Sequence, residues 1–420
     1  MSNHFADLQS LQSELVTRLD LRRTDVSRMR DEELRLLAGQ CIREIMTARG
    51  IAQGADRVRL ERQLLQDAVG RGVLEDLLDD DEVTEIMVNG PEAIFIEREG
   101  ILSRSTLRFA GAAALARVIE RLLQPTGRRV DEASPMVDAR LPDGSRINVI
   151  IPPLAVHGTA VTIRKFGQRR FGIQELMAAG ALSRDMAAFL EAAVRERRNI
   201  VVSGGTGSGK TTLLNALSAL VPEGERIVTI EDSAELQLDH PNLVTLQSRP
   251  SNLEGQGLVT IRELVRNALR MRPDRIVVGE CRGGEALDML QAMNTGHSGS
   301  LTTAHANSPR DLLSRLEVMV LMAGMDLPVA AIREQVASAV NLVVQQARFP
   351  SGRRRIVQIT EVTGMEGGRI QMQEIFRFDP AGAESPGGRF IASGNQPVFL
   401  ENRELATLGL TRAMFAGAAS

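Results

Sequence analysis

One stretch of nine residues constrains this chain more than any other feature of its sequence. Residues 204–212, Gly-Gly-Thr-Gly-Ser-Gly-Lys-Thr-Thr, fit the phosphate-loop pattern G-x-x-x-x-G-K-[ST] at every fixed position. The apolar run at 199–203 predicts a buried strand before the loop, and residues 212–217 predict a helix after it. A phosphate loop requires this strand and this helix, so the sequence predicts a nucleotide site rather than a glycine-rich surface turn.

The residue types in this loop suit the binding of ATP and Mg²⁺. Glycines let the backbone wrap phosphate groups with its N–H groups pointing inward, and the following helix N-terminus adds roughly half a positive charge. Lys210 is expected to contact the β- and γ-phosphates, and Thr211 to offer a hydroxyl ligand to Mg²⁺. The predicted phosphate-binding residues are Gly204, Gly205, Thr206, Gly207, Ser208, Gly209, Lys210, Thr211 and Thr212.

Composition excludes several other classes of protein. The 420 residues carry a formal net charge of -3, which gives no reason to expect a nucleic acid as partner. Cys41 and Cys281 are the only cysteines, too few for a disulfide framework or a four-cysteine zinc site, and they fit a reducing cytoplasm. The N-terminus lacks the regions of a signal peptide, and the most apolar stretch, 318–331, is too short to span a bilayer. Membrane association is therefore expected to be peripheral.

The first part of the chain contains two patterns, which predict two different domains. Leucines at 8, 11, 15 and 19 recur at helical spacing, which predicts an N-terminal helical bundle over residues 1–72. A partner-docking role for these helices is compatible with a packed bundle. Alternating strands around an Asn-Gly turn at 89–90 then predict an α+β domain over residues 73–166. Residues 167–180 are expected to be a linker.

The second part of the chain alternates predicted strands and helices. Strands are expected at 226–231 and 275–279, and helices at 261–271 and 286–293. Such alternation indicates a parallel sheet covered by helices, here over residues 181–378. The segment rich in Pro, Gly, Ala and Ser after Asp379 predicts a C-terminal tail over 379–420 that is partly mobile.

Carboxylates follow two of these predicted strands. Glu231, Asp232 and Glu235 come at the end of the first strand, and Glu280 at the end of the second. Ligands of parallel sheets bind at the carboxyl edge, where such side chains would meet a nucleotide. Asp232 would serve equally well as a helix N-cap, and that alternative stays open.

Four boxes in a fixed order carry a specific resemblance. The segments 204–212, 230–235, 269–282 and 295–307 resemble the Walker A, Asp, Walker B and His boxes of the type II/type IV secretion ATPase superfamily. The resemblance covers roughly residues 75 to 360. It implies an α/β fold: a RecA-like P-loop ATPase domain preceded by a PAS-like α+β domain and the N-terminal helical bundle.

The resemblance also implies roles for the residues of these boxes. Glu235 would be the base that activates water, with Glu231 and Asp232 in support, and Glu280 would take the Walker B role near Mg²⁺. His297 and His305, the histidines of the last box, would contact the γ-phosphate side of the site. A polar connection between strands is the alternative for this box. Cys281 is expected to be a small strand-end residue rather than a nucleophile.

An arginine that reaches the γ-phosphate can accelerate hydrolysis by roughly 10³ to 10⁵. The candidates from the α+β domain are Arg140, Arg146 and Arg164. An ordinary solvated surface competes closely with this interpretation, because the chain is rich in arginine. The alternatives from the ATPase domain are Arg249, Arg270 and Arg282.

Within the superfamily, residues 137–148 and the helical extension most resemble the assembly ATPase of tight-adherence (Flp-type) pili. This resemblance implies a homo-hexamer that hydrolyses ATP to drive assembly, and possibly retraction, of a type IV pilus. It would act on pilin indirectly, through an inner-membrane platform protein, from the cytoplasmic face of that membrane. The alternatives are a type IV secretion or conjugation ATPase, a nucleic-acid translocating RecA-like motor, and a nucleotide-dependent binding protein with little turnover.

Overall fold

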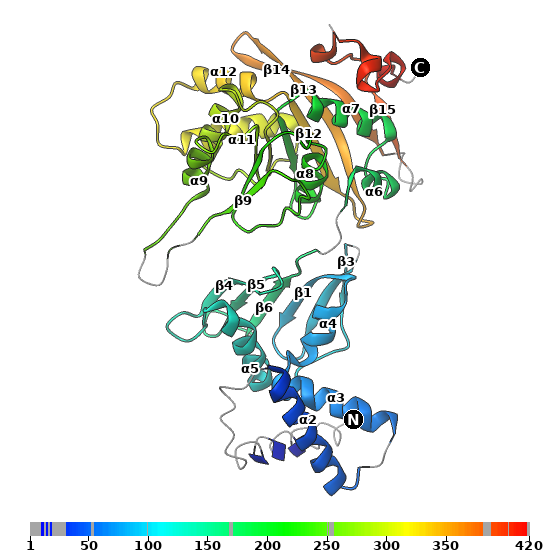
Figure 1. Cartoon of the computed structure of the whole chain (residues 1–420), viewed down its shortest axis with the longest axis vertical. Helices are drawn as coiled ribbons and strands as arrows, with labels where there is room; N and C mark the ends of the chain where they lie inside the picture. Colours follow the sequence, from blue (N-terminus) through cyan, green and yellow to red (C-terminus); the bar gives the residue numbers. More distant parts are fainter. Residues whose placement is uncertain are drawn as a thin grey trace. The chain divides into compact units, whose positions relative to one another are not determined.

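The computed structural model describes residues 10–11, 14–15, 17–18, 31–51, 54–98, 100–167, 171–249, 251, 256–380, 388–401 and 403–417. It divides into two compact units, Met1–Gln168 and Arg169–Ser420, and each is described by itself (Figure 1). The finer domain boundaries, near residues 72 and 180, stay predictions.

The N-terminal unit begins with helices α2 (Asp31–Ala48) and α3 (Ala55–Val69). Their apolar faces pack together with Leu11 and Leu15, which are 2% and 1% exposed, while the predicted positions Leu8 and Leu19 lie outside the described residues. Cys41 is buried in the same cluster without a disulfide partner. The helical spacing therefore marked a packed core, as stripes of this kind usually do.

The rest of this unit is one antiparallel sheet with helices on one face. Its described strands follow the order β3-β2-β1-β6-β5-β4, and alternate side chains of β1, β5 and β6 are buried against the apolar face of α5. The elements are η2 (Gly72–Leu74), α4 (Glu75–Asp79), β1 (Val83–Asn89), β2 (Ile94–Arg98), β3 (Ile101–Arg104), α5 (Ala112–Leu123), η3 (Gln124–Thr126), β4 (Met136–Arg140), β5 (Arg146–Ile150) and β6 (Ala160–Arg164).

The C-terminal unit is built on a larger sheet of order β15-β14-β13-β12-β7-β11-β10-β8-β9. The strands from β12 to β9 run parallel, and β13, β14 and β15 continue the sheet antiparallel. The strands are β7 (Ile200–Gly204), β8 (Ile227–Glu231), β9 (Leu243–Gln247), β10 (Arg275–Val278), β11 (Leu301–Ala304), β12 (Leu342–Arg348), β13 (Arg354–Glu366), β14 (Arg369–Asp379) and β15 (Arg389–Ala392).

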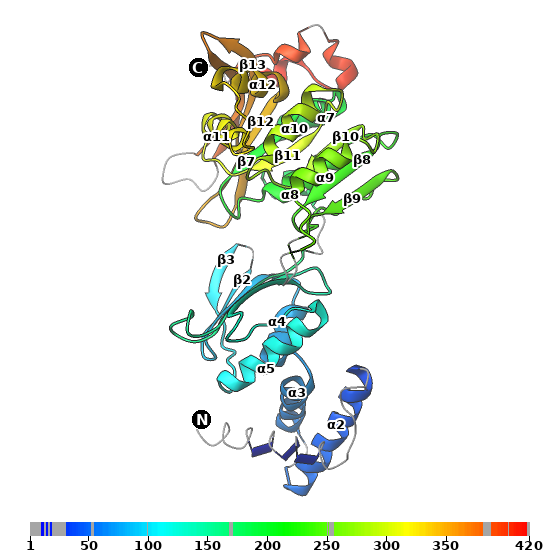
Figure 2. The same cartoon turned by 90° about the vertical axis from the view of Figure 1, so that its left-hand side faces the viewer.

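Helices cover both faces of this sheet (Figure 2). The apolar cores on its two sides are separate: α6, α7 and α8 pack into one, and α9, α10, α11 and α12 into the other. The central strands β7, β8, β10 and β11 are buried throughout, as strands covered on both faces must be. The helices are α6 (Ile173–Ala178), α7 (Arg184–Arg195), α8 (Lys210–Ser218), α9 (Ile261–Ala268), α10 (Glu285–Asn294), α11 (Pro309–Leu321) and α12 (Val329–Ala339). The predicted fold class is confirmed: a RecA-like α/β domain preceded by an α+β domain and an N-terminal helical bundle.

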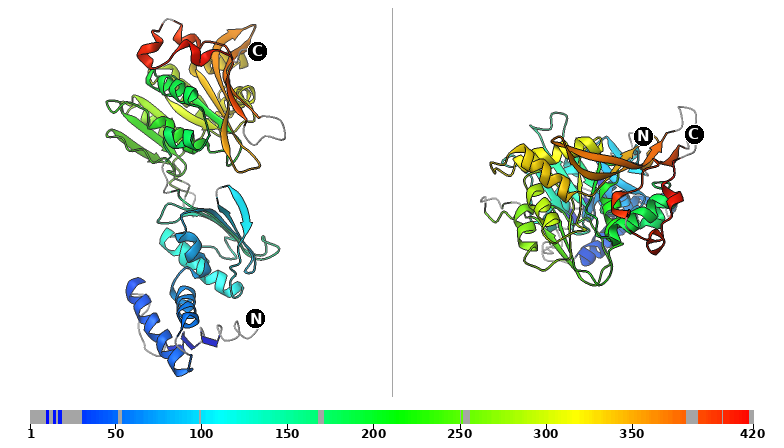
Figure 3. Two further views of the ribbon diagram at one scale, coloured as in Figure 1. Left: turned by 90° about the vertical axis from the view of Figure 1, so that its right-hand side faces the viewer. Right: turned by 90° about the horizontal axis from the view of Figure 1, so that it is seen from above.

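The segment after Asp379 differs from the expected tail. It adds β15 to the sheet edge and continues through the short helices η4 (Val398–Leu400), η5 (Leu405–Leu408) and η6 (Arg412–Phe415). The ring of Phe415 lies 5.8 Å from that of Phe189 on α7, centroid to centroid, and Leu400 and Leu410 are buried in the same core. Figure 3 shows the short C-terminal helices, in red, lying against the rest of the C-terminal unit. Apolar burial therefore holds this segment against the sheet. The Gly- and Pro-rich residues 381–387 lie outside the described part.

The described helices were also compared with the length and hydropathy that a bilayer requires. None of the described helices is both long enough and apolar enough to cross a bilayer.

Candidate functional site

The phosphate loop lies where its motif predicts, between the carboxyl end of β7 and the first turn of α8. Gly207 and Gly209 have φ angles of 70° and 96°, in the left-handed region that favours glycine. A Cβ on Gly204 would lie 2.3 Å from the carbonyl oxygen of Gln346 on the neighbouring strand β12. These positions therefore need glycine for both conformation and space.

Lys210 is folded back onto the loop. Its Nζ donates to the carbonyl oxygens of Gly204 at 3.1 Å and Gly205 at 3.0 Å, and the residue is only 8% exposed. Ser208 also donates to the Gly205 carbonyl, through its hydroxyl, at 2.9 Å. A bound phosphate would give this ammonium group a charged acceptor in place of neutral carbonyls.

Two of the predicted carboxylates organise the loop after β8. Glu231 is 3% exposed, and its Oε1 accepts the backbone N–H groups of Glu235 at 3.0 Å and Leu236 at 3.1 Å. Asp232 accepts the hydroxyl of Ser248 at 2.9 Å. Glu231 therefore fixes the backbone that carries Glu235, as a supporting residue would.

A line of ionisable side chains connects the phosphate loop with the end of β10. His305 follows the carboxyl end of β11, and its ring nitrogens lie 3.4 and 3.5 Å from Nζ of Lys210. Its Nε2 is also 3.1 Å from Oε1 of Glu280. Arg282 donates through Nε to Oε2 of the same carboxylate at 2.8 Å. Four predicted or candidate residues are thus in one network at the carboxyl edge of the sheet.

The network shifts the pKa values of Arg282 and His305. The hydrogen bond to Glu280 raises the pKa of Arg282, and the charges of Asp232 and Glu235 act in the same direction. Burial and the neighbouring charge of Lys210 lower the pKa of His305, although Glu280 acts in the opposite direction. His305 is therefore neutral at pH 7 and able to accept a hydrogen bond from Lys210.

This shift predicts a pH dependence of stability. The unfolded chain binds a proton at His305 near pH 6.5, whereas the folded chain binds it only at lower pH. Stability from this residue is therefore lost as the pH falls below about 6.5. Between pH 7.5 and pH 5.5 we expect Tm to fall further in the wild-type chain than in the His305→Asn variant. The two proteins differ only at residue 305, so an equal fall of Tm in both would contradict the prediction.

His297 does not lie in this network. The register pairs Leu301 with Ile200 at the start of β7, so residues before β11 lie at the amino edge, opposite the phosphate loop. Consistently, the hydroxyl of Ser300 donates to the His297 carbonyl at that edge. The expectation that both histidines approach the γ-phosphate is thus wrong for His297 within its own chain, because β11 separates the two.

The predicted arginines of the N-terminal unit form one row across its sheet. Arg140 pairs with Arg146, and Arg146 with Arg164, on the neighbouring strands β4, β5 and β6. Arg140 also lies over the ring of Phe166, 5.6 Å from its centroid, and Arg164 is 3.8 Å from a carboxylate oxygen of Glu85. Strand pairing therefore brings these three side chains to one end of three adjacent strands.

The arginines of the ATPase unit separate into two groups. Arg249 and Arg282 line the same cavity of about 570 Å³, together with Asp232. Arg270 follows the end of α9 and precedes β10, so it lies at the amino edge of the sheet. Only the first two are therefore near the predicted catalytic carboxylates.

Two further arginines contact the phosphate loop and were not among the predicted residues. Arg354 at the start of β13 donates through Nε to the carbonyl oxygen of Gly207 at 2.9 Å. Arg348 pairs with it across the hairpin, and a Cβ on Gly207 would lie 3.2 Å from its Nη1. The run of arginines to which Arg354 belongs, next to a glycine turn, is visible in the sequence. The pairing of β12 with β7 is what brings these arginines to the phosphate loop.

Neither a reactive thiol nor a protein-only metal centre is part of this arrangement. Burial raises the pKa of Cys281 to about 12, and its Sγ lies 3.3 Å from the Thr302 hydroxyl, which fits a strand-end residue. Among the described residues, no three His, Cys, Asp or Glu side chains are grouped so that they could hold a metal ion. Thr211 and Glu280 are hard oxygen donors, so they suit a Mg²⁺ ion that takes its other ligands from phosphate and water.

Known proteins resemble most of this chain. The profile of the family described as "Type II/IV secretion system protein" matches residues 67–376. A putative conjugal transfer protein of Mycobacterium tuberculosis is 42% identical over 324 residues, which are 76% of this chain and 91% of that protein. The conjugal transfer protein TrbB of Rhizobium radiobacter is 36% identical, over 74% of this chain and 92% of its own length.

Among solved structures, the VirB11 ATPase of the Brucella suis type IV secretion system, in complex with sulphate, is 34% identical. The match covers 68% of this chain and 95% of that one, with a TM-score of 0.38.

Proposed function

The chain belongs to the family of type II/IV secretion system proteins, and on this premise we propose that it is the motor of a type IV secretion or conjugal transfer apparatus. It is an ATPase. The observation that carries the hydrolytic part of the proposal is the network of Lys210, His305, Glu280 and Arg282 at the carboxyl edge of the sheet. This network joins a phosphate loop to the carboxylates that hydrolysis requires.

In the proposed reaction, Lys210 leaves the carbonyls of Gly204 and Gly205 for the β- and γ-phosphates of ATP. Thr211 and Glu280 would hold Mg²⁺, which when bound supplies positive charge that stabilises the transition state. Glu235 accepts the proton of the attacking water, and Glu231 positions its backbone. His305, which is neutral beside Lys210, lies between the phosphate loop and Glu280. A movement of Lys210 toward phosphate therefore changes the surroundings of the Glu280 carboxylate through His305.

Arg354 positions the phosphate loop in this proposal. Its hydrogen bond holds the Gly207 carbonyl, and in a trans peptide the N–H of Ser208 points the other way, where it donates to the Gly205 carbonyl at 3.4 Å. A bound phosphate would replace that long bond with a charged acceptor. Arg354→Ala should raise KM for ATP by about tenfold, a loss of roughly 1.4 kcal/mol, with a smaller effect on kcat. Steady-state phosphate release at varied ATP concentration measures both constants.

The matched control is Arg353→Ala, since Arg353 is the adjacent exposed residue of the same turn. It should leave KM unchanged. Equal constants for Arg354→Ala and the wild-type chain would remove Arg354 from the nucleotide site.

Two of the functions expected from the sequence are pilus assembly and secretion or conjugal transfer. Secretion or conjugal transfer has the better support. The named relatives that cover most of this chain are conjugal transfer and type IV secretion proteins. One observation favours the other candidate, assembly of a tight-adherence pilus: the family match starts at residue 67, after helix α2 and most of α3. A helical N-terminal extension, together with residues 137–148, is what resembles the pilus ATPases in the sequence.

For either function we propose a homo-hexamer that acts at the cytoplasmic face of the inner membrane through integral membrane partners. The row formed by Arg140, Arg146 and Arg164 would then supply positive charge to a nucleotide, from its own chain or from a neighbouring subunit. Light scattering of the purified chain with and without an ATP analogue tests the hexamer. A monomer under both conditions would contradict it.

The deciding experiment is a complementation test, in which cells that lack the gene express either the wild-type chain or the Lys210→Ala variant. Transfer of a plasmid or protein to recipient cells is counted, and surface pili are imaged in the same cultures. The proposal requires that transfer depend on Lys210. Loss of pili with unchanged transfer would establish the pilus candidate instead. Hydrolysis that nucleic acid stimulates, with a steep salt dependence, would indicate a nucleic-acid translocating motor.

A further inference from the structure

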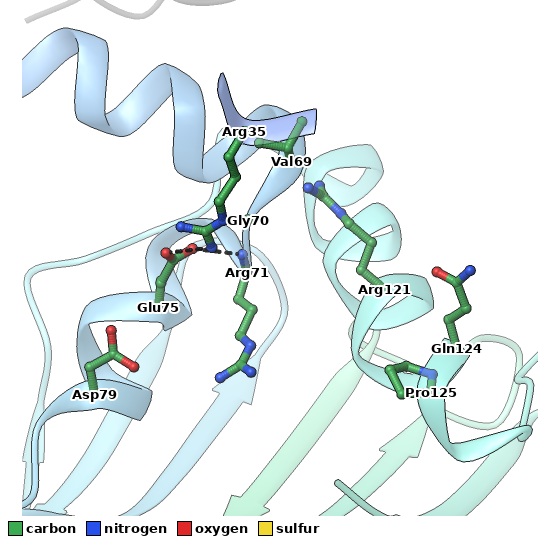
Figure 4. A pocket seen from close by; sticks show the side chains of 9 residues that line it. All are labelled: Arg35, Val69, Gly70, Arg71, Glu75, Asp79, Arg121, Gln124 and Pro125. Atoms are coloured by element: carbon green, nitrogen blue, oxygen red, sulfur yellow. Dashed lines mark hydrogen bonds and ion pairs between the residues drawn. The ribbon is translucent and has the colours of Figure 1, made fainter. Parts of the chain in front are cut away.

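A cavity of about 670 Å³ in the N-terminal unit is lined by Arg35, Arg71 and Arg121 (Figure 4). Arg35 is neutralised, because its Nη2 donates to Oε1 of Glu75 at 2.8 Å. The guanidinium groups of Arg71 and Arg121 point to opposite ends of the cavity. These arginines therefore do not converge on one ligand. The carboxyl edge of the C-terminal sheet differs, because buried contacts there are directed at one residue of the proposed reaction, Glu280.

The regular pairing of β10 with β11 ends before Glu280. The two strands pair at Val277 with Leu301 and at Val278 with Thr302. Since β10 ends at Val278, Glu280 lies two residues beyond the strand. A carboxylate that acts on the transition state must be held at a defined position, and a displacement of about 1 Å can cost 10²-fold in rate. Contacts outside the regular pairing must therefore hold the backbone at Glu280.

Thr303 of β11 makes such contacts on both sides of Glu280. Its hydroxyl donates to the carbonyl oxygen of Gly279 at 2.7 Å. Its own carbonyl oxygen accepts the N–H of Cys281 at 2.8 Å. Thr303 is 1% exposed, so water does not compete for these hydrogen bonds. The residues before and after Glu280 are thus both bonded to one residue of the neighbouring strand.

Gly279 is also held from the side of β8. Its N–H donates to the carbonyl oxygen of Ile230 at 2.9 Å. A Cβ on Gly279 would lie 2.8 Å from Cγ of Glu231, so the glycine backbone packs closely against that side chain. The peptide before Glu280 therefore lies between β8 and the hydroxyl of Thr303, and the hydroxyl is the side-chain donor of this arrangement.

Given the proposed role of Glu280 in hydrolysis, we propose that Thr303 is a positioning residue for this reaction. Its hydroxyl fixes the peptide before Glu280, so that the carboxylate lies 3.1 Å from Nε2 of His305 and 2.8 Å from Nε of Arg282. Thr303 does not touch the nucleotide in this proposal. Because the carboxylate acts in the transition state, a change in its position alters kcat more than KM.

The test uses two substitutions of Thr303 in the full chain. Thr303→Val keeps the branched shape and removes the hydroxyl, so kcat for ATP hydrolysis should fall by about tenfold while KM stays within about twofold. Thr303→Ser keeps the hydroxyl and should restore kcat to within about threefold of the wild-type value. Steady-state phosphate release measures both constants, at a temperature well below the Tm of each variant.

The matched control is Thr302→Val, the same substitution at the preceding residue of β11. Thr302 is 2% exposed, and its hydroxyl lies 3.3 Å from Sγ of Cys281 and 3.4 Å from the carbonyl oxygen of Thr303. A thiol is a weak partner and the second contact is long, so kcat should stay within about twofold of wild type.

A double substitution separates positioning of Glu280 from a general loss of structure. In the Glu280→Gln background, Thr303→Val should lower kcat by less than about twofold, because the carboxylate that it positions is already absent. A full tenfold loss in that background would overturn the proposal, as would a Thr303→Ser variant as slow as Thr303→Val. A wild-type kcat in Thr303→Val, with a slow Glu280→Gln, overturns the role of Thr303 alone. A wild-type kcat in Glu280→Gln overturns the proposed role of Glu280 and the role of Thr303 with it.

Discussion

Lys210→Ala should lower kcat/KM for ATP hydrolysis by about 10² to 10⁴. The ammonium group is expected to contact two phosphates, and each charge-assisted hydrogen bond contributes about 1.5–3 kcal/mol. In the structure Nζ is bonded to two neutral carbonyls and lies beside His305, so ATP would replace weak partners with charged ones. Phosphate release by the purified wild-type and variant chains measures the effect.

The composition of the chain provides an internal control for this prediction. Lys165 and Lys210 are its only lysines, so an amine-directed label can reach two side chains. Lys165 lies in the N-terminal unit, where its Nζ donates to the Asp80 carbonyl at 2.6 Å. ATP should protect Lys210 from the label and leave the labelling of Lys165 unchanged. Labelling of Lys210 that ATP does not reduce would show that the lysine does not contact the nucleotide.

The parts of the site that could be predicted from the sequence are local ones. The phosphate loop, its strand and its helix are contiguous, and the glycines that need φ angles of 70° and 96° are part of the motif itself. Glu231 ends one apolar strand and Glu280 lies two residues beyond another, and the carboxyl ends of parallel strands lie at the same edge. The edge that carries these groups could therefore be predicted without knowing the order of the strands.

Other contacts depend on strand order, which the sequence did not provide. The strand β11 was not among the predicted elements, so nothing indicated that its four residues separate His297 from His305. At about 3.3 Å per residue, such a strand carries the chain across the sheet. Arg354 reaches the loop only because β12 is inserted beside β7 and then turns back as β13.

The C-terminal segment shows a different kind of error. Its Pro- and Gly-rich part predicted a tail, because that composition disfavours regular structure. The apolar residues beyond it, Leu400, Leu410 and Phe415, are 0%, 1% and 3% exposed. A short helix with few apolar positions gives a weak periodic pattern, so burial of this segment could be seen only in the packed chain.

Glu280→Gln should lower kcat by about 10² to 10³ while the chain still binds ATP. The amide keeps the shape of the side chain but loses the charge that holds Arg282 at 2.8 Å and lies 3.1 Å from His305. In the proposed reaction Glu280 would also help to hold Mg²⁺, and the amide lacks the charge for that role where negative charge develops. ATP affinity depends mainly on the phosphate loop, so equilibrium binding of a fluorescent ATP analogue should change little.

The same substitution has a readout that does not depend on hydrolysis. Glu280 raises the pKa of His305 against the effects of burial and Lys210, so the pKa should fall further in Glu280→Gln. Proton NMR of the histidine ring measures this. Glu235→Gln is the matched comparison, because Glu235 is the predicted base and lies on the loop after β8. If Glu235→Gln hydrolyses ATP at the wild-type rate while Glu280→Gln does not, the base is Glu280, and neither the carboxylate nor the charge of Glu235 is needed for hydrolysis.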